Sequence, residues 1–478
     1  MKRRALKKSV ACLLLLAMLT GVLTSCGFTV RYINLMKQPK RVETLMMRSN
    51  KVIEKANSYT LDLEMEFSGF VSGVGTTATA TGRLQYAGLL KGEYGFWSDM
   101  ETTVSVEGIA QKQVLKQSEG FVNGKSIQYY KSEEILQRLW SEMSKEEYLA
   151  SRQDEQNDLM PDLEKLEGSE AETSCTYEKG EGWTIQFKNF DETAVEELMK
   201  LFGGKESLIG AEEIDSLSFC FRIGEDLAPL SFSVELVGEK PEFEDPATIT
   251  ISATYRDINE TEIEEIDLSE YTEVDDIRVL DSFSKALEDA GNREEGHFRL
   301  SIHQDYKLEF ADTEMSEEDF VNFYQKDGKY SYEIKAKLAS GNVFIYYEDG
   351  KKQALSSGKA NTTESDDETE KAFIEGLIDQ GGFDLNRNRV SDITVKNAED
   401  GVYELVVENP YFSGMPSLEA LVGAYADDTK GIYTVTIRDE ALIEYTYSFE
   451  AEFAGMDGKT YHYRMTCVYR LVEEEIEL

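Results

Sequence analysis

Residues 59–67 read YTLDLEMEF, and apolar and polar side chains alternate through this segment without a break. Successive side chains of a β-strand point to opposite faces of a sheet, so the segment predicts a strand with one buried face and one solvated face. Before it, residues 42–56 place apolar side chains at helical spacing. After it, Asn123-Gly124 predicts a tight hairpin turn, because both residue types tolerate a positive φ. Further strands are predicted at 76–86, 93–106, 111–117 and 126–131.

The same order of elements recurs after residue 279. A helical pattern at 279–290 precedes Phe298, Leu300 and Ile302, which alternate as Tyr59, Leu61 and Leu63 do. Two further series correspond in order: Trp183, Ile185 and Phe187 with Tyr403, Leu405 and Val407, and Tyr255-Arg256 with Tyr469-Arg470. An ordered series of matching segments indicates an internal repeat.

The fold class predicted is α+β, with two tandem copies of a curved antiparallel sheet. Long twisted sheets tend to curl, so each copy is expected to form a half-open barrel with short helices across its apolar face. The first copy is placed at 42–270, the junction at 271–278 and the second copy at 279–478. Part of the acidic stretch Glu260–Asp276 is expected to pair with the first sheet.

The first 27 residues have the composition of an export signal. Five bases (Lys2, Arg3, Arg4, Lys7 and Lys8) precede the apolar run 10–19, which is too short to cross a bilayer as a helix. The segment then ends in Leu23-Thr24-Ser25-Cys26.

This ending resembles the lipobox of bacterial lipoproteins. The resemblance implies that residues 1–25 are a signal peptide, that Cys26 carries a thioether-linked diacylglycerol, and that residues 26–41 form a lipidated tether. Two acyl chains anchor a protein stably, so the expected location is the extracytoplasmic face of the cell membrane. The alternatives are an ordinary cleaved signal peptide and a short uncleaved anchor.

With the lipobox, the element order resembles the lipoprotein-carrier superfamily (LolA/LppX-like half-barrels) and uncharacterised lipoproteins of Gram-positive bacteria. That resemblance implies a lipid or other hydrophobic ligand held between a curved sheet and a helical lid. The alternative is that the inward side chains simply fill the core, as they do in most small curved sheets. The candidate ligand-lining residues are Tyr59, Leu61, Leu63, Met65, Phe96 and Trp183 in the first copy, and Phe298, Leu300, Ile302, Tyr403 and Tyr447 in the second.

The charge balance constrains the partners. The chain has 92 Asp and Glu residues against 50 Lys and Arg, a formal net charge of −42. Such a field repels phosphate backbones, so nucleic-acid binding is excluded and a basic envelope protein becomes the alternative partner.

No cofactor, metal or catalytic site is predicted. Cys175, Cys220 and Cys467 are too few and too widely spaced for a disulfide framework. His297 and His303 would lie about 20 Å apart on one strand, too far to bind one metal ion. The acidic run Glu364–Glu368 lacks the ordered spacing of a calcium loop, so 356–370 is expected to be a mobile, solvated segment.

The function predicted is that of a membrane-anchored, non-catalytic lipoprotein that binds a hydrophobic ligand or an envelope partner. The alternative is an interaction lipoprotein with filled cores, whose acidic surface meets cationic partners. An enzyme would require clustered carboxylates with raised pKa values in a cleft.

Overall fold

The structure is a computed structural model of the 478-residue chain. Contacts divide the chain into two compact units: residues 1–138 with 142–270, and residues 139–141 with 271–478. The described residues are 37, 39–71, 74–108, 112–133, 135–158, 167–200, 213–239, 246–291, 296–308, 313–326, 329–338, 341–356, 359–370, 387–408, 430–438, 441–454 and 460–472. The sequence-predicted signal peptide and Cys26 lie outside these residues.

The first sheet has twelve strands, in the order β12-β6-β5-β4-β3-β2-β1-β11-β10-β9-β8-β7. All of the registered pairs are antiparallel except β12 with β6, which run parallel. The strands are β1 Tyr59–Val71, β2 Val74–Ala87, β3 Gly95–Val106, β4 Gln113–Val122, β5 Lys125–Lys131, β6 Leu136–Glu142, β7 Glu172–Glu178, β8 Gly182–Lys188, β9 Glu213–Ile223, β10 Pro229–Glu239, β11 Ala247–Arg256 and β12 Thr272–Glu273.

Strand β1 lies in the middle of this sheet and shows the alternation that the sequence predicts. Leu61 lies opposite Leu84 on β2 and Tyr255 on β11, so the apolar side chains of neighbouring strands share one face. The side chains of that face are buried, including Leu61, Leu63, Met65, Ile249 and Ile251. This face is the core of the first unit.

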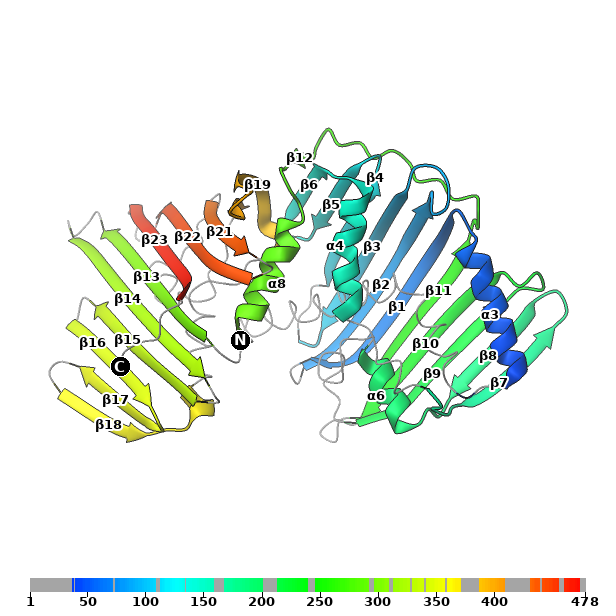
Figure 1. Ribbon diagram of the computed structural model, residues 1–478, viewed down its shortest axis with the longest axis horizontal. Helices are drawn as coiled ribbons and strands as arrows, with labels where there is room; N and C mark the ends of the chain where they lie inside the picture. The colour runs from blue at the N-terminus through cyan, green and yellow to red at the C-terminus, as the bar shows by residue number, and fades with distance from the viewer. Residues whose placement is uncertain are drawn as a thin grey trace. The chain divides into compact units, whose positions relative to one another are not determined.

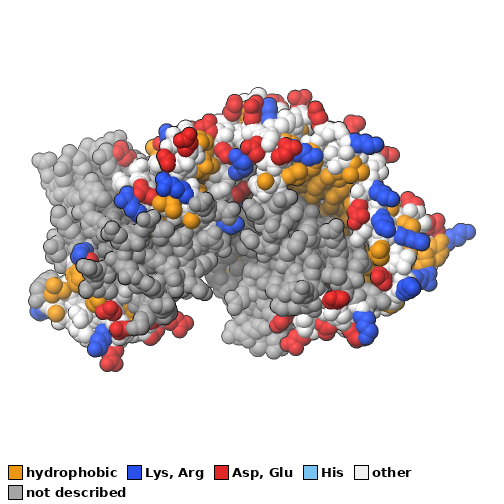
Figure 2. Space-filling view, viewed as in Figure 1, with side chains coloured by type: hydrophobic (Ala, Val, Ile, Leu, Met, Phe, Trp, Pro, Cys, Tyr) orange, Lys and Arg blue, Asp and Glu red, His pale blue; other side chains and the backbone are white. Residues whose placement is uncertain are grey.

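The opposite face carries charged side chains in cross-strand pairs. Asp62 on β1 forms ion pairs with Arg83 on β2 at 2.9 Å and with Arg256 on β11 at 2.5 Å. On the side of the molecule that Figure 2 shows, acidic and basic side chains are also interspersed among the described residues. Exposed pairs of this kind contribute little stability, so burial on the apolar face is what holds the sheet.

Three helices lie on the apolar face of the first sheet (Figure 1): α3 Lys40–Glu54, α4 Lys145–Asp158 and α6 Glu192–Lys200. Helix α3 buries Val42, Leu45 and Met46 on the side that faces the sheet. None of the helices among the described residues is long and apolar enough to cross a membrane.

Two of these helices begin with capping interactions. At α4, the Ser144 hydroxyl accepts the Glu147 backbone N–H, while a Glu147 carboxylate oxygen accepts the Ser144 N–H at 2.9 Å. At α6, the Asp191 carboxylate accepts the Ala194 N–H at 2.8 Å. Both arrangements satisfy backbone donors that the first turn of a helix leaves open.

The hairpin turn predicted at Asn123-Gly124 is confirmed. Both residues have positive φ angles, 54° and 76°, and join β4 to β5. That pair of angles suits a two-residue turn whose twist matches its strands.

The second sheet has eleven strands, in the order β18-β17-β16-β15-β14-β13-β23-β22-β21-β20-β19, and all its registered pairs are antiparallel. Neither sheet closes into a barrel. The strands are β13 Gly296–Leu308, β14 Thr313–Lys326, β15 Lys329–Leu338, β16 Gly341–Glu348, β17 Lys351–Ser356, β18 Lys359–Glu364, β19 Val390–Asn397, β20 Val402–Glu408, β21 Lys430–Arg438, β22 Ala441–Ala454 and β23 Thr460–Val472, with a 3-10 helix η1 Arg387–Arg389.

The helix α8, Val279–Gly291, packs on β21 and β22 in the second unit. Its Phe283 is fully buried and contacts the rings of Tyr433 and Tyr445, with centroids 5.8 Å and 6.0 Å away. The helix predicted at 279–290 is therefore present, and its apolar side faces the sheet.

The expectation of a mobile loop at 356–370 is wrong. Residues 359–364 form β18, which pairs with β17, and residues 367–370 are helical. The segment is polar, but the backbone pairing of β18 and the contacts of Glu370 described below fix it to the sheet.

Candidate functional site

The predicted ligand-lining residues of the first unit lie on the apolar face. Leu61, Leu63, Met65 and Phe96 are buried, with 1–4% of each residue exposed. Tyr59 and Trp183 are half-buried. The Arg41 guanidinium lies over the Trp183 ring, 4.5 Å from its centroid.

In the second unit, Tyr447 is buried and stacks on Tyr433, while Tyr403 is half-buried. Phe298, Leu300 and Ile302 lie in β13, but their side chains are outside the described residues. The ligand predicted for these residues stays a prediction.

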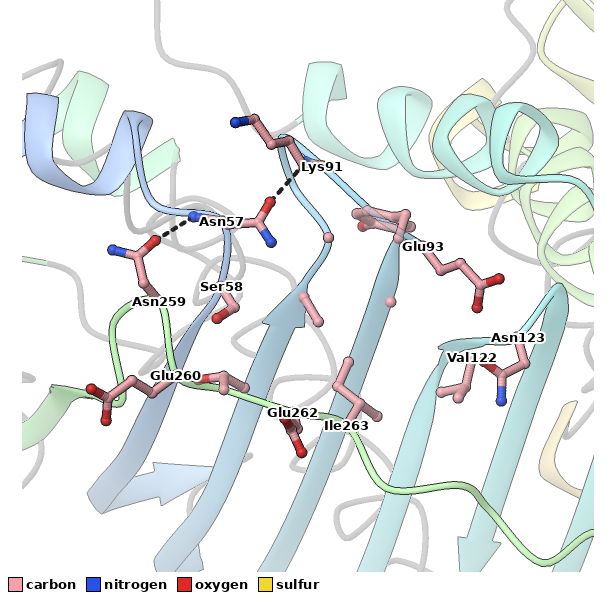
Figure 3. A pocket seen from close by; sticks show the side chains of 15 residues that line it. Asn57, Ser58, Lys91, Glu93, Val122, Asn123, Asn259, Glu260, Glu262 and Ile263 are labelled. Carbon is pink, nitrogen blue, oxygen red and sulfur yellow. Dashed lines mark hydrogen bonds between the residues drawn. The ribbon is translucent and has the colours of Figure 1, made fainter.

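A pocket of about 490 Å³ lies elsewhere in the first unit, at the ends of β1, β2, β3 and β4 (Figure 3). It is lined by none of the residues that the sequence predicted. The lining residues come from four segments: Asn57 and Ser58; Ala87, Gly88, Lys91, Glu93, Tyr94 and Gly95; Val122 and Asn123; and Asn259 to Ile263.

One wall of the pocket is a segment that we call the strap, residues 257–268. It follows β11 and crosses the polar face of the sheet, opposite to the face that the helices cover. Thr60, Gln85 and Gly95, which alternate with the buried Leu61, Leu84 and Phe96, are its contacts on β1, β2 and β3. The strap itself has no strand pairing, and only Thr272–Glu273 beyond it pairs with the sheet, as β12.

Hydrogen bonds hold the strap to β1. The Asn259 N–H donates to the Ser58 carbonyl oxygen at 2.7 Å, and the buried hydroxyls of Thr60 and Thr261 lie 2.9 Å apart. Further along, Gln85 donates from its side-chain amide to the Glu262 carbonyl at 3.4 Å. The strap is thus fixed in position by backbone and buried groups.

The turn that leads into the strap depends on residues that tolerate a left-handed conformation. Asp257 and Asn259 have φ angles of 51° and 68°. Asp and Asn are the non-glycine residues that most readily adopt such angles. The Asp257 carbonyl then accepts the N–H groups of Glu260 and Thr261.

Asn57 ties three segments of the pocket together. Its side-chain oxygen accepts the N–H groups of Leu90 at 3.0 Å and Lys91 at 2.8 Å, and its own backbone N–H donates to the Asn259 side-chain oxygen at 2.7 Å. The two accepted bonds identify which end of the Asn57 amide is oxygen. Its NH₂ group donates to no described residue and can therefore donate to a ligand in the pocket.

The remaining polar groups of the pocket have mixed character. Glu93 and Asn123 lie across the pocket from Asn57 and Ser58, while the Lys91 side chain extends away from the other lining residues (Figure 3). Ser58 is 4% exposed, and its hydroxyl makes no hydrogen bond to a described residue. Val122, Ile263 and Tyr94 add apolar surface.

A second group of polar side chains lies in the other unit. Tyr332 and Lys352 donate to the buried Glu370 carboxylate, Lys352 at 2.8 Å, and Tyr347 donates to Asp367. Burial acts to raise the pKa of Glu370, but the hydrogen bonds from Lys352, Ser365 and Tyr332 outweigh it and hold that pKa below its usual value. Burial, helped by the bond to Asp367, raises the pKa of Tyr347 to about 12.

These contacts give the acidic run 364–368 a structural role. Asp366 accepts the Thr369 N–H at 2.8 Å as a helix cap, and Asp367 accepts the Tyr347 hydroxyl. The carboxylates fix the start of a helix to β15, β16 and β17.

The two thiols that the structure describes lack the surroundings that make cysteine reactive. Cys175 and Cys220 are half-buried and unpaired, and burial raises the pKa of both. A raised pKa lowers the thiolate fraction, which is the nucleophilic form. The side chains of Cys467, His297, His303 and His462 lie outside the described residues.

Sequence reasoning missed the pocket because its residues are far apart in the chain. Asn123 belonged to the predicted turn, residues 93–95 to a predicted strand and residues 260–263 to the acidic stretch, but none of these patterns indicated that the segments meet around a pocket. Asn57 and Asn259 carried no signal, since each acts through a contact formed only when the sheet is assembled.

No family model matches the chain, and no curated protein matches it either. Among solved structures it is similar to the ywiB protein from Bacillus subtilis, at 9% identity over 39% of this chain and 98% of that chain, with a TM-score of 0.12. A DUF1329 family protein from Desulfovibrio piger matches at 8% identity over 41% and 93%, with a TM-score of 0.16. A double mutant of the vaccine antigen transferrin binding protein B from Haemophilus parasuis matches at 6% over 88% and 76%, with a TM-score of 0.15. These weak similarities identify neither a family nor a function.

Proposed function

We propose that the chain is a lipid-anchored, extracytoplasmic protein that acts by binding and not by catalysis. The observation that carries the anchor is the order of three signals in residues 1–26: a basic start, a short apolar run and Leu23-Thr24-Ser25-Cys26. A short apolar run suits export, and a diacylated Cys26 would then hold the mature protein at the membrane.

We also infer that the two units are tandem copies of one fold. In each, five consecutive strands extend outward from a central strand, β2 to β6 from β1 and β14 to β18 from β13. The chain then returns so that the last long strand (β11 or β23) pairs with that central strand. The sequence correspondences fall on matching strands: Trp183, Ile185 and Phe187 lie in β8 and their counterparts in β20, while Tyr255 lies in β11 and Tyr469 in β23.

The binding mode that the geometry supports best uses the exterior of the protein. Leu61 and Tyr447 are 1% exposed and Leu63 is 2% exposed, so little space for a ligand lies beside them. Packed apolar faces favour the interaction lipoprotein, whose net charge of −42 suits a basic envelope protein as partner.

The anchor is tested by labelling cells with palmitate. We expect the wild-type chain to incorporate label and to sediment with membranes, whereas Cys26→Ser does neither because it has no thiol to modify. Cys12→Ser, which changes a cysteine inside the apolar run, is the matched control and should behave as wild type. Equal labelling and membrane retention of Cys26→Ser would refute the anchor.

Binding is tested by crosslinking in intact cells and by native mass spectrometry of the full chain released from membranes in detergent. We expect crosslinks to a basic protein that weaken as salt rises, because exposed charges are screened. A protein mass with a co-purified lipid, and no salt-sensitive crosslink, would instead support the hydrophobic-ligand mode.

A further inference from the structure

We propose that the pocket beside the strap binds a neutral, hydroxyl-rich ligand of one or two sugar rings. The proposal concerns a site on the polar face of the first sheet, so it is independent of the lipid anchor and of whatever binds the acidic exterior.

The pocket has the size of a small-molecule site. Its volume of about 490 Å³ lies within the range typical of ligand pockets. Val122, Ile263 and Tyr94 give it apolar surface. Sugar rings present C–H faces that suit such surface, together with hydroxyls that require polar partners.

The polar groups offer both donors and acceptors. The Asn57 oxygen is occupied by Leu90 and Lys91, so the group that Asn57 offers to a ligand is its NH₂. The Glu93 carboxylate only accepts, and the Ser58 hydroxyl can do both. Of these groups, Ser58 indicates a ligand most strongly, because it is 96% buried and its hydroxyl faces the pocket without a partner among the described residues.

This combination disfavours charged ligands. An anion such as phosphate would meet Glu93 and Glu262, while Lys91 extends away from the other lining residues (Figure 3). An ammonium ion has donors only and would leave the Asn57 NH₂ group without an acceptor. A sugar hydroxyl both donates and accepts, and can therefore satisfy Asn57, Ser58 and Glu93 together.

The pocket is also held in shape before any ligand binds. Asn57 fixes residues 89–91 and the strap, and the strap is fixed to β1 through Ser58 and the Thr60–Thr261 pair. Prior ordering reduces the entropy lost on binding.

The test is titration calorimetry of the full chain in detergent with glucose, N-acetylglucosamine and maltose, and with phosphate and putrescine as the charged comparisons. We expect saturable binding of at least one saccharide. Glu93→Ala should weaken saccharide binding about tenfold, because one charge-assisted hydrogen bond is lost. Ser58→Ala should weaken it about fivefold. Glu66→Ala, an exposed carboxylate on β1 outside the pocket, is the matched control and should bind as wild type.

A second measurement does not depend on the variants folding. In the wild-type chain, bound saccharide should slow amide hydrogen exchange at residues 57–60 and 259–263. Binding of phosphate or putrescine in place of saccharide, absence of binding to any member of the panel, or saccharide binding that leaves exchange in both segments unchanged would each overturn the proposal.

Discussion

Tyr347 shows how a single buried hydroxyl couples the second unit to pH. Its ring is fully buried and stacks on Tyr332, and its hydroxyl donates to Asp367. Ionising it would place a negative charge in a buried site beside a carboxylate. The fold therefore favours the protonated form, which is why its pKa rises to about 12 from an ordinary value of about 10.

The consequence for stability has a definite sign. Between about pH 10 and pH 12 an unfolded chain has lost this proton while the folded chain keeps it, so the stabilisation is complete below the lower value and is lost as pH rises through the upper one. We expect the free energy of unfolding, measured in urea, to decrease between about pH 9 and about pH 11.5 in the wild-type chain. In Tyr347→Phe, which has no hydroxyl to ionise at this position, the decrease should be smaller. An equal fall in the variant and in wild type would contradict this role for Tyr347.

At the level of elements, the strands were predictable and the strap was not. The alternation at 59–67 identifies a strand and its buried face, because apolar side chains point to the buried face and polar side chains to the solvated face. The capped helices and the Asn123-Gly124 turn were predictable for a similar reason, since their chemistry is local. By contrast, residues 257–268 show only an imperfect alternation. Their positions are set by contacts with Thr60, Gln85 and Gly95 on three different strands.

The same limit explains the error at 356–370 and the missed pocket. Lys359–Glu364 is polar and exposed on both faces, so no alternation marks it as β18, and only pairing with β17 makes it a strand. The pocket needs Asn57 and Asn259 to meet from positions about 200 residues apart, a closure that no local pattern encodes.

The strap depends on a buried hydroxyl pair, which gives an element-scale prediction. Thr261 donates to the Asp257 carbonyl at 3.0 Å, so Thr60, which is 3% exposed, is the donor toward Thr261. Thr261→Val keeps the shape but leaves the Thr60 hydroxyl buried without an acceptor, which should cost about 1–3 kcal/mol. Hydrogen exchange at 259–263 should accelerate in Thr261→Val. It should not change in Thr250→Val, an exposed threonine of β11, and equal behaviour of the two variants would contradict this role for the pair.

For the whole molecule, the decisive feature is that each unit has an apolar core of its own. Phe187 is fully buried on β8 and packs edge-on against Phe221 at 6.0 Å, within the first unit. Phe283 is fully buried on α8 against Tyr433 and Tyr445, within the second. A core is the part of a domain that unfolds cooperatively, so two cores predict two transitions.

We therefore expect urea unfolding, followed by hydrogen exchange of peptides from β1–β11 and from β13–β23, to resolve one transition for each set. Phe187→Ala should destabilise only the first set and Phe283→Ala only the second, each by about 3–5 kcal/mol, because truncating a buried phenylalanine loses its transfer free energy and leaves a cavity. Ser282→Ala, exposed on the same helix as Phe283, should move neither transition. If both phenylalanine substitutions shift both peptide sets together, the two cores unfold as one. That result would contradict the expectation that each copy unfolds independently.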